Sequence, residues 1–335
     1  MTSPYSPPYA LTPGILDLVA GIAETAGRLG ALEGEGNRPK LRRENRLRSI
    51  QASLAIENNS LSLEQVTAVI AGKRVLGPPR EIQEVRNAFA AYEAMPSWHP
   101  ATAKDLLAAH RLLIQGLADD AGKFRRGSVG IAQGGRVIHL APPADRVPGL
   151  MKDLLAWLRR GEVHPLVASC VFHYELEFIH PFTDGNGRMG RLWQTLVLSR
   201  WNPLFAWLPV ETVIRDQQAE YYQILATCDK AGNSTAFIAF LLAALLKALQ
   251  EIGSTDQVAD QVTDQVGNLL RTLAKDTLPA LECMKRLGLS HRPTFRANYL
   301  NPAIAAELVE MTIPEKPNSR LQRYRLTPQG RLSIL

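Results

Sequence analysis

The sequence predicts a mainly helical fold with one β-hairpin in its middle and a small helix-and-strand region at its end. Over most of the chain, apolar residues recur every three to four positions, the spacing that puts them on one face of a helix. Hydrophobic residues make up 46% and charged residues 21% of the 335 residues, ordinary values for a protein that buries a core. Before residue 300, only 128–140 has alternating apolar residues around a Gly-Gly pair, which is typical of a hairpin.

Helices account for most of the first 250 residues. An amphipathic helix is expected over 14–32 and a second over 38–58, and Ser62 is suited to cap a third. Further helices are expected over 81–94, 102–117, 148–160, 165–179, 188–201 and 219–229. The most apolar stretch, 236–249, has the period of a core-facing helix. At about 14 residues it is too short to cross a bilayer, so we expect no membrane contact.

A linker helix and a winged helix are expected after residue 252. The triplet Asp-Gln-Val recurs every four residues over 256–266, which places its valines on one stripe of a helix. The stripe is either a plain amphipathic linker or a contact with a partner, for which a second copy of the chain is one candidate. Short helices over 278–287, 292–300 and 302–310, followed by two strands within 311–326, are in the winged-helix order. The expected regions are therefore 1–100, 101–252 and 253–335.

The net positive charge of the chain lies in the part of this last region that begins at Arg271. The net charge is +6, with 38 basic and 32 acidic residues. From Arg271 to the end there are 11 Lys or Arg and 5 Asp or Glu, so this region alone accounts for the excess. The basic residues that such a fold would turn towards phosphates are Arg292, Arg296, Lys316, Arg320, Arg323 and Arg325. Winged helices also dock proteins, so DNA and a protein are both candidate partners.

Cysteine usage indicates a reducing compartment. Cys170, Cys228 and Cys283 are odd in number and far apart, which excludes a disulfide framework and a CxxC metal site. The N-terminus lacks the basic start and apolar stretch of a signal peptide. A cytoplasmic location is expected.

The strongest functional signal is HPFTDGNGRMGR over 180–191. A Gly-Asn-Gly turn entering a helix can direct successive N–H groups towards one anion, at the positive end of the helix dipole. Arg188 and Arg191 are three apart and share a helix face on which they can hold neighbouring phosphates. Asp184 supplies the hard oxygen that Mg²⁺ prefers, and His180 titrates near neutrality. Base, metal ligand, anion cradle and cationic clamp are the components of phosphoryl transfer.

This motif resembles the HxFx(D/E)GNGRxxR signature of the Fic family and matches every fixed position. The resemblance, clearest over about 106–249, implies a Fic-type helical bundle and transfer of AMP from ATP to a Tyr, Thr or Ser hydroxyl of a protein, with release of diphosphate. His180 would be the general base and Asp184 the Mg²⁺ ligand, while Phe182 would anchor the loop. The nucleotide's phosphates would be bound by Gly185, Asn186, Gly187, Arg188 and Arg191.

A second resemblance lies upstream, where SLAIEN over 53–58 is similar to the family's inhibitory motif (S/T)xxxE(G/N). Ser53 and Glu57 are four apart and share one helical face. By this resemblance Glu57 would pair with Arg191 and keep it from the γ-phosphate, because a carboxylate competes directly for the same guanidinium donors.

Four further features keep two interpretations each. The hairpin 128–140 resembles the family's flap, which would align a target by strand addition beside Ile138 and His139, or it is only structural. Tyr221 and Tyr222 either contact adenine or pack in the core. The pair His173 and Glu177 either binds a metal or is a buried hydrogen-bonded support, and the absence of HExxH favours support. The basic run Lys123, Arg125 and Arg126 is either solvated or assists the phosphates.

The sequence therefore predicts a self-inhibited protein adenylyltransferase that uses ATP with Mg²⁺. One alternative is a winged-helix DNA-binding regulator, in which the basic C-terminal region has the main role. Another is a Fic enzyme that removes AMP, with Glu57 positioning a water. Nucleotides such as UTP are also conceivable, since the motif contacts phosphates rather than the base.

Overall fold

The computed structural model describes residues 4–33, 39–133, 136–274, 276–316 and 319–332. Side chains are described in these ranges except in 31–33, 39–40, 130–133, 136–140 and 254–264 and at 329 and 332. The chain forms two compact units, Met1–Gln250 and Glu251–Leu335. The first unit spans the regions expected over 1–100 and 101–252 except for residues 251 and 252.

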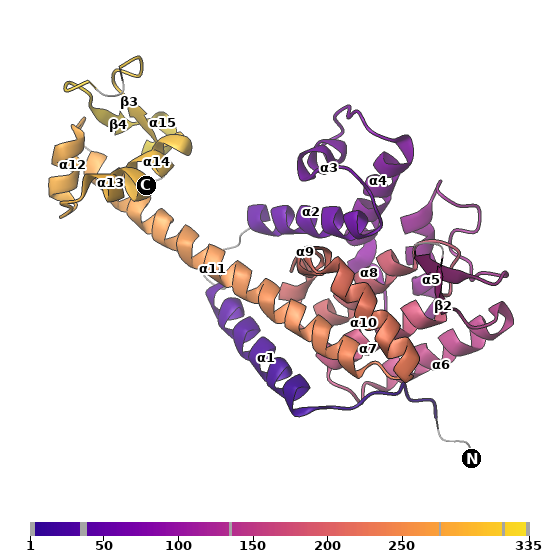
Figure 1. Ribbon diagram of the computed structural model, residues 1–335. Coiled ribbons are helices and arrows are strands. Elements are labelled where there is room, and N and C mark those ends of the chain that lie inside the picture. The colour runs from indigo at the N-terminus through magenta and orange to yellow at the C-terminus, as the bar shows by residue number, and fades with distance from the viewer. Residues whose placement is uncertain (1–3, 34–38, 134–135, 275, 317–318, 333–335) are drawn as a thin grey trace. The chain divides into compact units, whose positions relative to one another are not determined.

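The first unit is a helical bundle with one hairpin, and the chain as a whole is mainly α (Figure 1). Its α-helices are α1 (Pro13–Glu33), α2 (Pro39–Ile56), α3 (Leu63–Ile70), α4 (Pro79–Ala94), α5 (Ala103–Ile114), α6 (Val147–Arg160), α7 (Pro165–Ile179), α8 (Asn186–Trp201), α9 (Val210–Asp216), α10 (Gln218–Ala231) and the beginning of α11 (Thr235–Leu273). Short 3₁₀ turns are η1 (Met95–Ser97), η2 (Ala144–Arg146) and η3 (Pro203–Ala206).

The core lies around α7 and α8, which pack along each other. Nearly all residues of both helices are buried, including several polar ones of α8, as expected for helices surrounded by others. Helices α2, α5 and α6 pack around this pair, and α2 also lies against α9. Ser49 of α2 donates a hydrogen bond to the buried carboxylate of Glu211 in α9, at 2.8 Å. These contacts place the C-terminal end of α2 over the N-terminal end of α8.

Local sequence explains several helix boundaries. At α3, Ser62 accepts a bond from the Gln65 backbone N–H, and the Gln65 side chain accepts one from the Ser62 N–H, so the expected cap is a full capping box. Helix α6 ends at Gly161 in a left-handed conformation (φ 66°), the usual helix stop. The predicted hairpin is present as β1 (Gly130–Gln133) and β2 (Arg136–Leu140), paired antiparallel with a register shift between Ile131 and Ala132.

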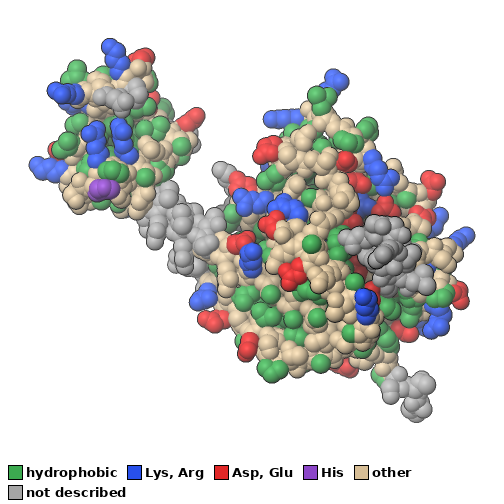
Figure 2. Space-filling view, in the orientation of Figure 1, with side chains coloured by type: hydrophobic (Ala, Val, Ile, Leu, Met, Phe, Trp, Pro, Cys, Tyr) green, Lys and Arg blue, Asp and Glu red, His purple; other side chains and the backbone are tan. Residues whose placement is uncertain are grey.

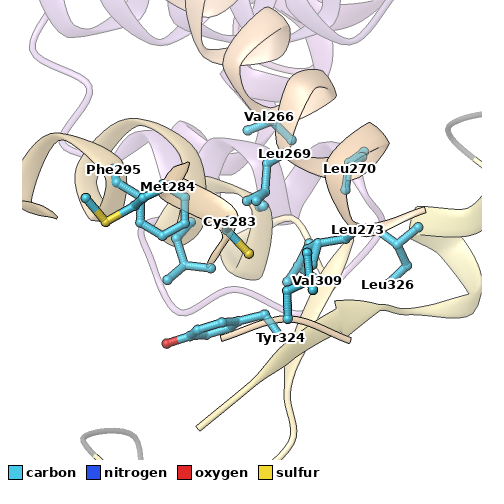
Figure 3. Packing of buried hydrophobic residues seen from close by; sticks show 13 residues of the cluster. Val266, Leu269, Leu270, Leu273, Cys283, Met284, Phe295, Val309, Tyr324 and Leu326 are labelled. Atoms are coloured by element: carbon cyan, nitrogen blue, oxygen red, sulfur yellow. The ribbon is translucent and has the colours of Figure 1, made fainter. Parts of the chain in front are cut away.

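The second unit has its own hydrophobic cluster, formed by side chains of helices and of a two-stranded sheet (Figure 3). Leu269, Leu270 and Leu273 at the end of α11 contribute to it together with Phe295 and Tyr324. The remaining elements are α12 (Ala280–Arg286), α13 (Arg292–Phe295), a π-helical turn η4 (Arg296–Leu300), α14 (Asn301–Ala305), β3 (Val309–Met311), β4 (Tyr324–Leu326) and α15 (Pro328–Leu332). Strands β3 and β4 pair antiparallel.

One prediction about this unit was wrong in detail. The helices expected over 292–300 and 302–310 form one helical run from Arg292 to Ala305, because Pro302 sits in the first turn of α14, where its missing N–H is not needed. The run ends there, since β3 begins at Val309. The end of α11 also packs into the core of this unit, a contact that the sequence interpretation did not include.

The apolar stretch is longer than the sequence estimate of 14 residues. Within the described part of the chain, 1 helix segment, Thr235–Gly253, is long and apolar enough by length and composition to cross a membrane. Of this segment 56% is buried inside the structure, and core helices pass the same test. Phe237, Ile238 and Leu241, at its beginning, are fully buried in the first unit.

Candidate active site

The motif forms a tight loop between α7 and α8. Gly185 has a positive φ of 86° just before α8 begins, and a Cβ there would lie 2.6 Å from Ile114 of α5. Asn186 closes the loop with its buried side chain, because Oδ1 accepts from the Phe182 N–H at 3.0 Å and Nδ2 donates to the Phe182 carbonyl at 2.9 Å. The Asn186 side chain therefore holds the loop, and only its backbone N–H lies at the helix N-terminus for an anion.

His180 ends α7 in a left-handed conformation with φ 49°, which is uncommon for a residue with a side chain. Its Nδ1 lies 3.3 Å from the Glu177 carbonyl. Arg125 fixes the backbone at this point, since its Nε donates to the His180 carbonyl at 2.7 Å and Nη2 donates to the Ile179 carbonyl at 3.3 Å. Strained backbone of this kind persists only where surrounding contacts determine it, and Arg125 supplies them.

His110 of α5 holds the motif loop by a hydrogen bond and by ring stacking. Its Nδ1 accepts from the Gly122 N–H at 2.9 Å, so its Nε2 carries the proton and donates to the Asp184 carbonyl at 3.0 Å. The ring stacks on Phe182 with centroids 3.7 Å apart. Burial lowers the pKa of His110, which favours the neutral form that this bonding requires. Phe182 is fully buried, as expected of a loop anchor.

The first motif arginine, Arg188, is 5% exposed and lies between two carboxylates. Its Nη2 is 2.7 Å from Asp184 Oδ1, and its Nη1 is 3.5 Å from Glu84 Oε1 of α4. Its Nε is buried without a hydrogen-bond partner among the described residues. Arg80, also on α4, donates to the other oxygen of Asp184 at 2.8 Å.

The second motif arginine, Arg191, is 1% exposed and bonds to the end of α2. Its Nε and Nη2 donate to the Ser53 hydroxyl and carbonyl, both at 2.9 Å, and Nη2 is also 2.8 Å from Glu57 Oε1. Burial lowers the pKa of Arg191, but Glu57 and other neighbours outweigh it, so the pKa is raised overall. The contact predicted between Glu57 and Arg191 is therefore present.

Gly187 lies against the segment that contains Ser53 and Glu57. A Cβ at this position would lie 2.2 Å from Glu57 Oε1 and 3.1 Å from Arg191 Nη1. Its φ is not positive, in contrast to the turn expected from the sequence, because Gly187 is already in the first turn of α8. The residue is thus needed for space rather than for backbone freedom. Arg191 Nη1 is buried and has no hydrogen-bond partner within the described ranges.

The side chains around the motif loop suit a metal ion that binds together with a nucleotide, rather than one held by protein ligands alone. Among the described residues no three His, Cys, Asp or Glu side chains are grouped closely enough to hold an ion. Asp184 offers one carboxylate that is 36% exposed. Mg²⁺ in nucleotide enzymes is commonly held by one or two carboxylates with the rest of its shell from phosphates and water, which this arrangement permits.

The two tyrosines considered as adenine contacts differ in how deeply they are buried. Tyr221 is 1% exposed, bonds to His173 Nε2 at 3.2 Å and packs among core rings, so the core interpretation holds and an adenine contact is not available to it in this structure. Tyr222 is partly exposed and its hydroxyl donates to the Ile56 carbonyl at 3.4 Å, next to Glu57. It stays a candidate for the nucleotide pocket.

The expected pairing of His173 with Glu177 is loose. The two side chains are 3.9 Å apart, beyond hydrogen-bond distance. His173 Nδ1 instead lies 2.9 Å from the side-chain oxygen of Gln194 on α8. Burial lowers the pKa of His173 to about 3, so it is a neutral residue of the α7–α8 interface.

The flap residues are described only by their backbone. Ile138 and His139 lie in β2, and their side chains fall outside the described part of the structure. Of the basic run before the hairpin, Lys123 and Arg126 are exposed, whereas Arg125 is buried. Neither interpretation offered for Arg125 was right, because it binds backbone carbonyls rather than water or phosphate.

Comparison with known proteins agrees with this geometry. Residues 100–198 match the model of the Fic/DOC family, and residues 264–327 match the C-terminal domain of Filamentation induced by cAMP protein Fic-like. A crystal structure of a Fic family protein from Desulfovibrio desulfuricans G20 is 61% identical, covers 97% of this chain and 99% of its own, and superposes with a TM-score of 0.76. The chain belongs to the Fic family.

Curated relatives in the family are more distant. Protein adenylyltransferase fic-1 of Caenorhabditis briggsae is 30% identical over 216 residues, which is 60% of this chain and 40% of that protein. Protein adenylyltransferase Fic of Drosophila melanogaster is 28% identical over 221 residues, 62% of this chain and 42% of that protein. The chain thus matches less than half the length of these relatives. A structure of Fic-1 from Caenorhabditis elegans, 23% identical over 73% of this chain and 72% of its own with a TM-score of 0.58, shares the fold.

Sequence reasoning missed two contributors to the Fic site, Arg80 and His110, and named a third, Arg125, without its role. Arg80, His110 and Arg125 lie 55 or more residues before the motif residues that they bind. None has a distinguishing local pattern, because each acts through a contact made only by folding. The one available signal was a charged or titratable residue on an otherwise apolar helix face, as for His110 on α5.

Proposed function

We propose that this Fic protein is a protein adenylyltransferase that moves AMP from ATP to a Tyr, Thr or Ser hydroxyl of a protein. The observation that carries the proposal is the motif loop, which places His180 and two buried arginines around the N-terminus of α8. In the reaction His180 takes the hydroxyl proton, the hydroxyl oxygen bonds to the α-phosphorus, and the bond from that phosphorus to the bridging oxygen breaks. Diphosphate leaves with the electron pair. The curated relatives named protein adenylyltransferase support this assignment.

The phosphates would lie against α8. Backbone N–H groups at the start of a helix attract anions, and Arg188 Nε and Arg191 Nη1 are buried donors without partners in the described part of the chain. A bound triphosphate would satisfy both. Asp184 would hold Mg²⁺, which neutralises phosphate charge when bound. Catalysis would then come mostly from positioning and from fixed positive charge.

Glu57 would keep this site inactive. Its carboxylate occupies Arg191 and lies over Gly187, where a phosphate would need to approach α8. A nucleotide must therefore compete with a carboxylate for the same guanidinium. Removal of AMP, the alternative for a Fic enzyme, would need Glu57 to hold a water. We favour transfer, because the curated relatives are named protein adenylyltransferase.

The proposal is tested with α-labelled ATP and Mg²⁺, with cell lysate as target. Three proteins are compared: the parent, Glu57→Gly, and Glu57→Gly combined with His180→Ala. Label should rise in Glu57→Gly and be lost in the double variant. Parallel reactions with α-labelled UTP define the nucleotide. Equal labelling by Glu57→Gly with and without His180 would remove the basis for the proposed base.

A specific observation also favours an anion-binding role for the C-terminal unit. A groove of about 750 Å³ lies between the start of α13 and the segment before β4, and Arg292, Arg296 and Arg320 line it. None of these three has a carboxylate partner among the described residues, whereas Arg286 and Arg325 of the same unit are paired. Figure 2 shows several basic side chains of this unit on the face in view, two of them next to each other near its centre.

We infer that this groove takes the phosphates of duplex DNA, since Arg292 and Arg296 sit at the start of the helical run that a winged helix inserts into the major groove. When binding of a labelled duplex is measured between about 50 and 200 mM salt, the logarithm of the binding constant should fall steeply with the logarithm of the salt concentration. Replacing Arg292 and Arg296 with alanine should reduce that slope by about one for each phosphate that is no longer bound. Arg286→Ala is the matched control, because Asp276 already pairs with it. No binding at low salt, or equal slopes, would leave a protein as the partner of this groove.

The buried thiols are in keeping with a reducing compartment, so we propose a cytoplasmic location. Cys170, Cys228 and Cys283 are all buried, and burial raises the pKa of Cys170 to about 12. Such thiols are inert hydrophobic residues rather than nucleophiles.

A further inference from the structure

The metal-ligand candidate Asp184 already has a cation on each carboxylate oxygen. Oδ1 is 2.7 Å from Arg188 Nη2, and Oδ2 is 2.8 Å from Arg80 Nη2. Mg²⁺ must take one of these oxygens, since a coordinated oxygen directs its lone pair at the metal. The protein therefore has an internal competitor for the metal at its expected ligand.

Four charged side chains alternate around this point. Arg80 and Glu84 are one turn apart on α4, and Asp184 and Arg188 are four residues apart in the motif. Glu84 Oε1 is 3.6 Å from Arg80 Nε and 3.5 Å from Arg188 Nη1, so each acid contacts both arginines. The group is neutral overall, which lets Arg188 and Glu84 remain mostly buried.

The exposure of the two arginines decides which one can leave. The Arg188 side chain is 5% exposed and the Arg80 side chain is 57% exposed. Arg80 can swing into water at little cost, and Glu84, on the same helix, remains as its partner. Arg188 has no such alternative, because leaving Asp184 would keep a buried charge with weaker pairing.

We propose that the Arg80 guanidinium pairs with the Asp184 oxygen that would otherwise bind the metal, and that this competition sets the Mg²⁺ concentration that nucleotide binding requires. This inference rests on the proposed function. Arg80 is a positioning residue in this scheme, since it acts through Asp184. Its release when Mg²⁺ and nucleotide bind together leaves Asp184 free for the metal and Arg188 unchanged. A residue that instead clamped phosphate would help nucleotide binding with or without metal, which separates the two possibilities.

The test measures binding of a fluorescent ATP analogue by anisotropy as Mg²⁺ is raised. It uses the full chain carrying Glu57→Gly, so that inhibition does not mask binding. Arg80→Gln in this background should lower the half-saturating Mg²⁺ concentration by about two- to fivefold, the size expected when a partly exposed ion pair no longer competes. Arg80→Lys should lie between Arg80→Gln and the parent, since it keeps a cation without the planar donor.

Arg86→Gln is the matched control, because Arg86 is an exposed arginine on the same helix with no contact to Asp184 among the described residues. It should leave the Mg²⁺ midpoint unchanged. An unchanged Mg²⁺ midpoint in Arg80→Gln overturns the inference. A second outcome also overturns it: if Arg80→Gln weakens analogue binding in EDTA as much as it does in Mg²⁺, Arg80 is a phosphate ligand. If the Glu57→Gly parent fails to bind the analogue at any Mg²⁺ concentration, the proposed function itself fails.

Discussion

Replacing Glu57 with glycine should lower the stability of the protein and raise its activity at the same time. Arg191 is 1% exposed, and the change removes its 2.8 Å contact with Glu57. Loss of one partner from a fully buried ion pair costs about 3–5 kcal/mol. Here Arg191 keeps two bonds to Ser53, and the Glu57 side chain is 34% exposed, so we expect a smaller loss. The free energy of unfolding should fall by about 1–2 kcal/mol.

The gain in activity follows from the same ion pair. A hydrogen bond to a charged group is worth about 1.5–3 kcal/mol, and a nucleotide would no longer have to displace it. The expected rise in kcat/KM for ATP is therefore about 10- to 100-fold. Urea unfolding and labelling with α-labelled ATP measure the two effects on the same preparations.

A fall in stability together with a rise in activity distinguishes the loss of an inhibitory contact from a general loss of structure, which would lower both. Glu44→Gly is the control, since Glu44 is exposed on α2, the helix that ends just before Glu57, and its replacement should cost about 1 kcal/mol of helix stability without any rise in labelling. A Glu57→Gly protein that is less stable but no more active would refute the reasoning, as would a similar activation by Glu44→Gly.

Three further predictions concern the loop and its supports. Gly187→Ala should lower the free energy of unfolding in the parent but much less in Glu57→Gly, because the added Cβ would lie 2.2 Å from Glu57 Oε1. A double-mutant cycle of urea unfolding measures this, and additive effects of the two changes would contradict it. Asn186→Ala should lower the free energy of unfolding by about 2–3 kcal/mol, since two buried bonds to Phe182 are removed, and thermal unfolding that is unchanged would argue against a locked loop. His173, whose pKa burial lowers to about 3, should stay neutral in NMR spectra of the folded protein down to pH 5. Because the unfolded chain takes up this proton near pH 6.5, the stability that His173 contributes is complete above that pH and falls by about 1.4 kcal/mol per pH unit towards pH 3. A shift change of the His173 ring between pH 7 and 5 would show that it is not buried as described.

The fold class and the core of the site were readable from sequence because they depend on short-range patterns. Apolar periodicity and glycine placement act within one helix or turn, and so they marked α7, the loop and α8. The spacing of Ser53 and Glu57 was likewise local, and it put both on the face that meets Arg191. The helix run through Pro302 was not predicted, because a proline there is compatible with either a new helix or a continued one.

Other features were decided by tertiary structure. The sequence left Tyr221 between an adenine contact and the core, and Arg125 between water and phosphate. The packed bundle buries both and gives each a structural partner. Arg80 meets Asp184 across 104 residues of chain, and no periodicity encodes such a pairing. The sequence alone determined which groups can hold phosphate, metal and proton, since that is a property of side-chain chemistry. Which of them are buried, paired or displaceable was set only by the packing of α2, α4 and α5 on the motif, because burial and pairing are relations between distant segments.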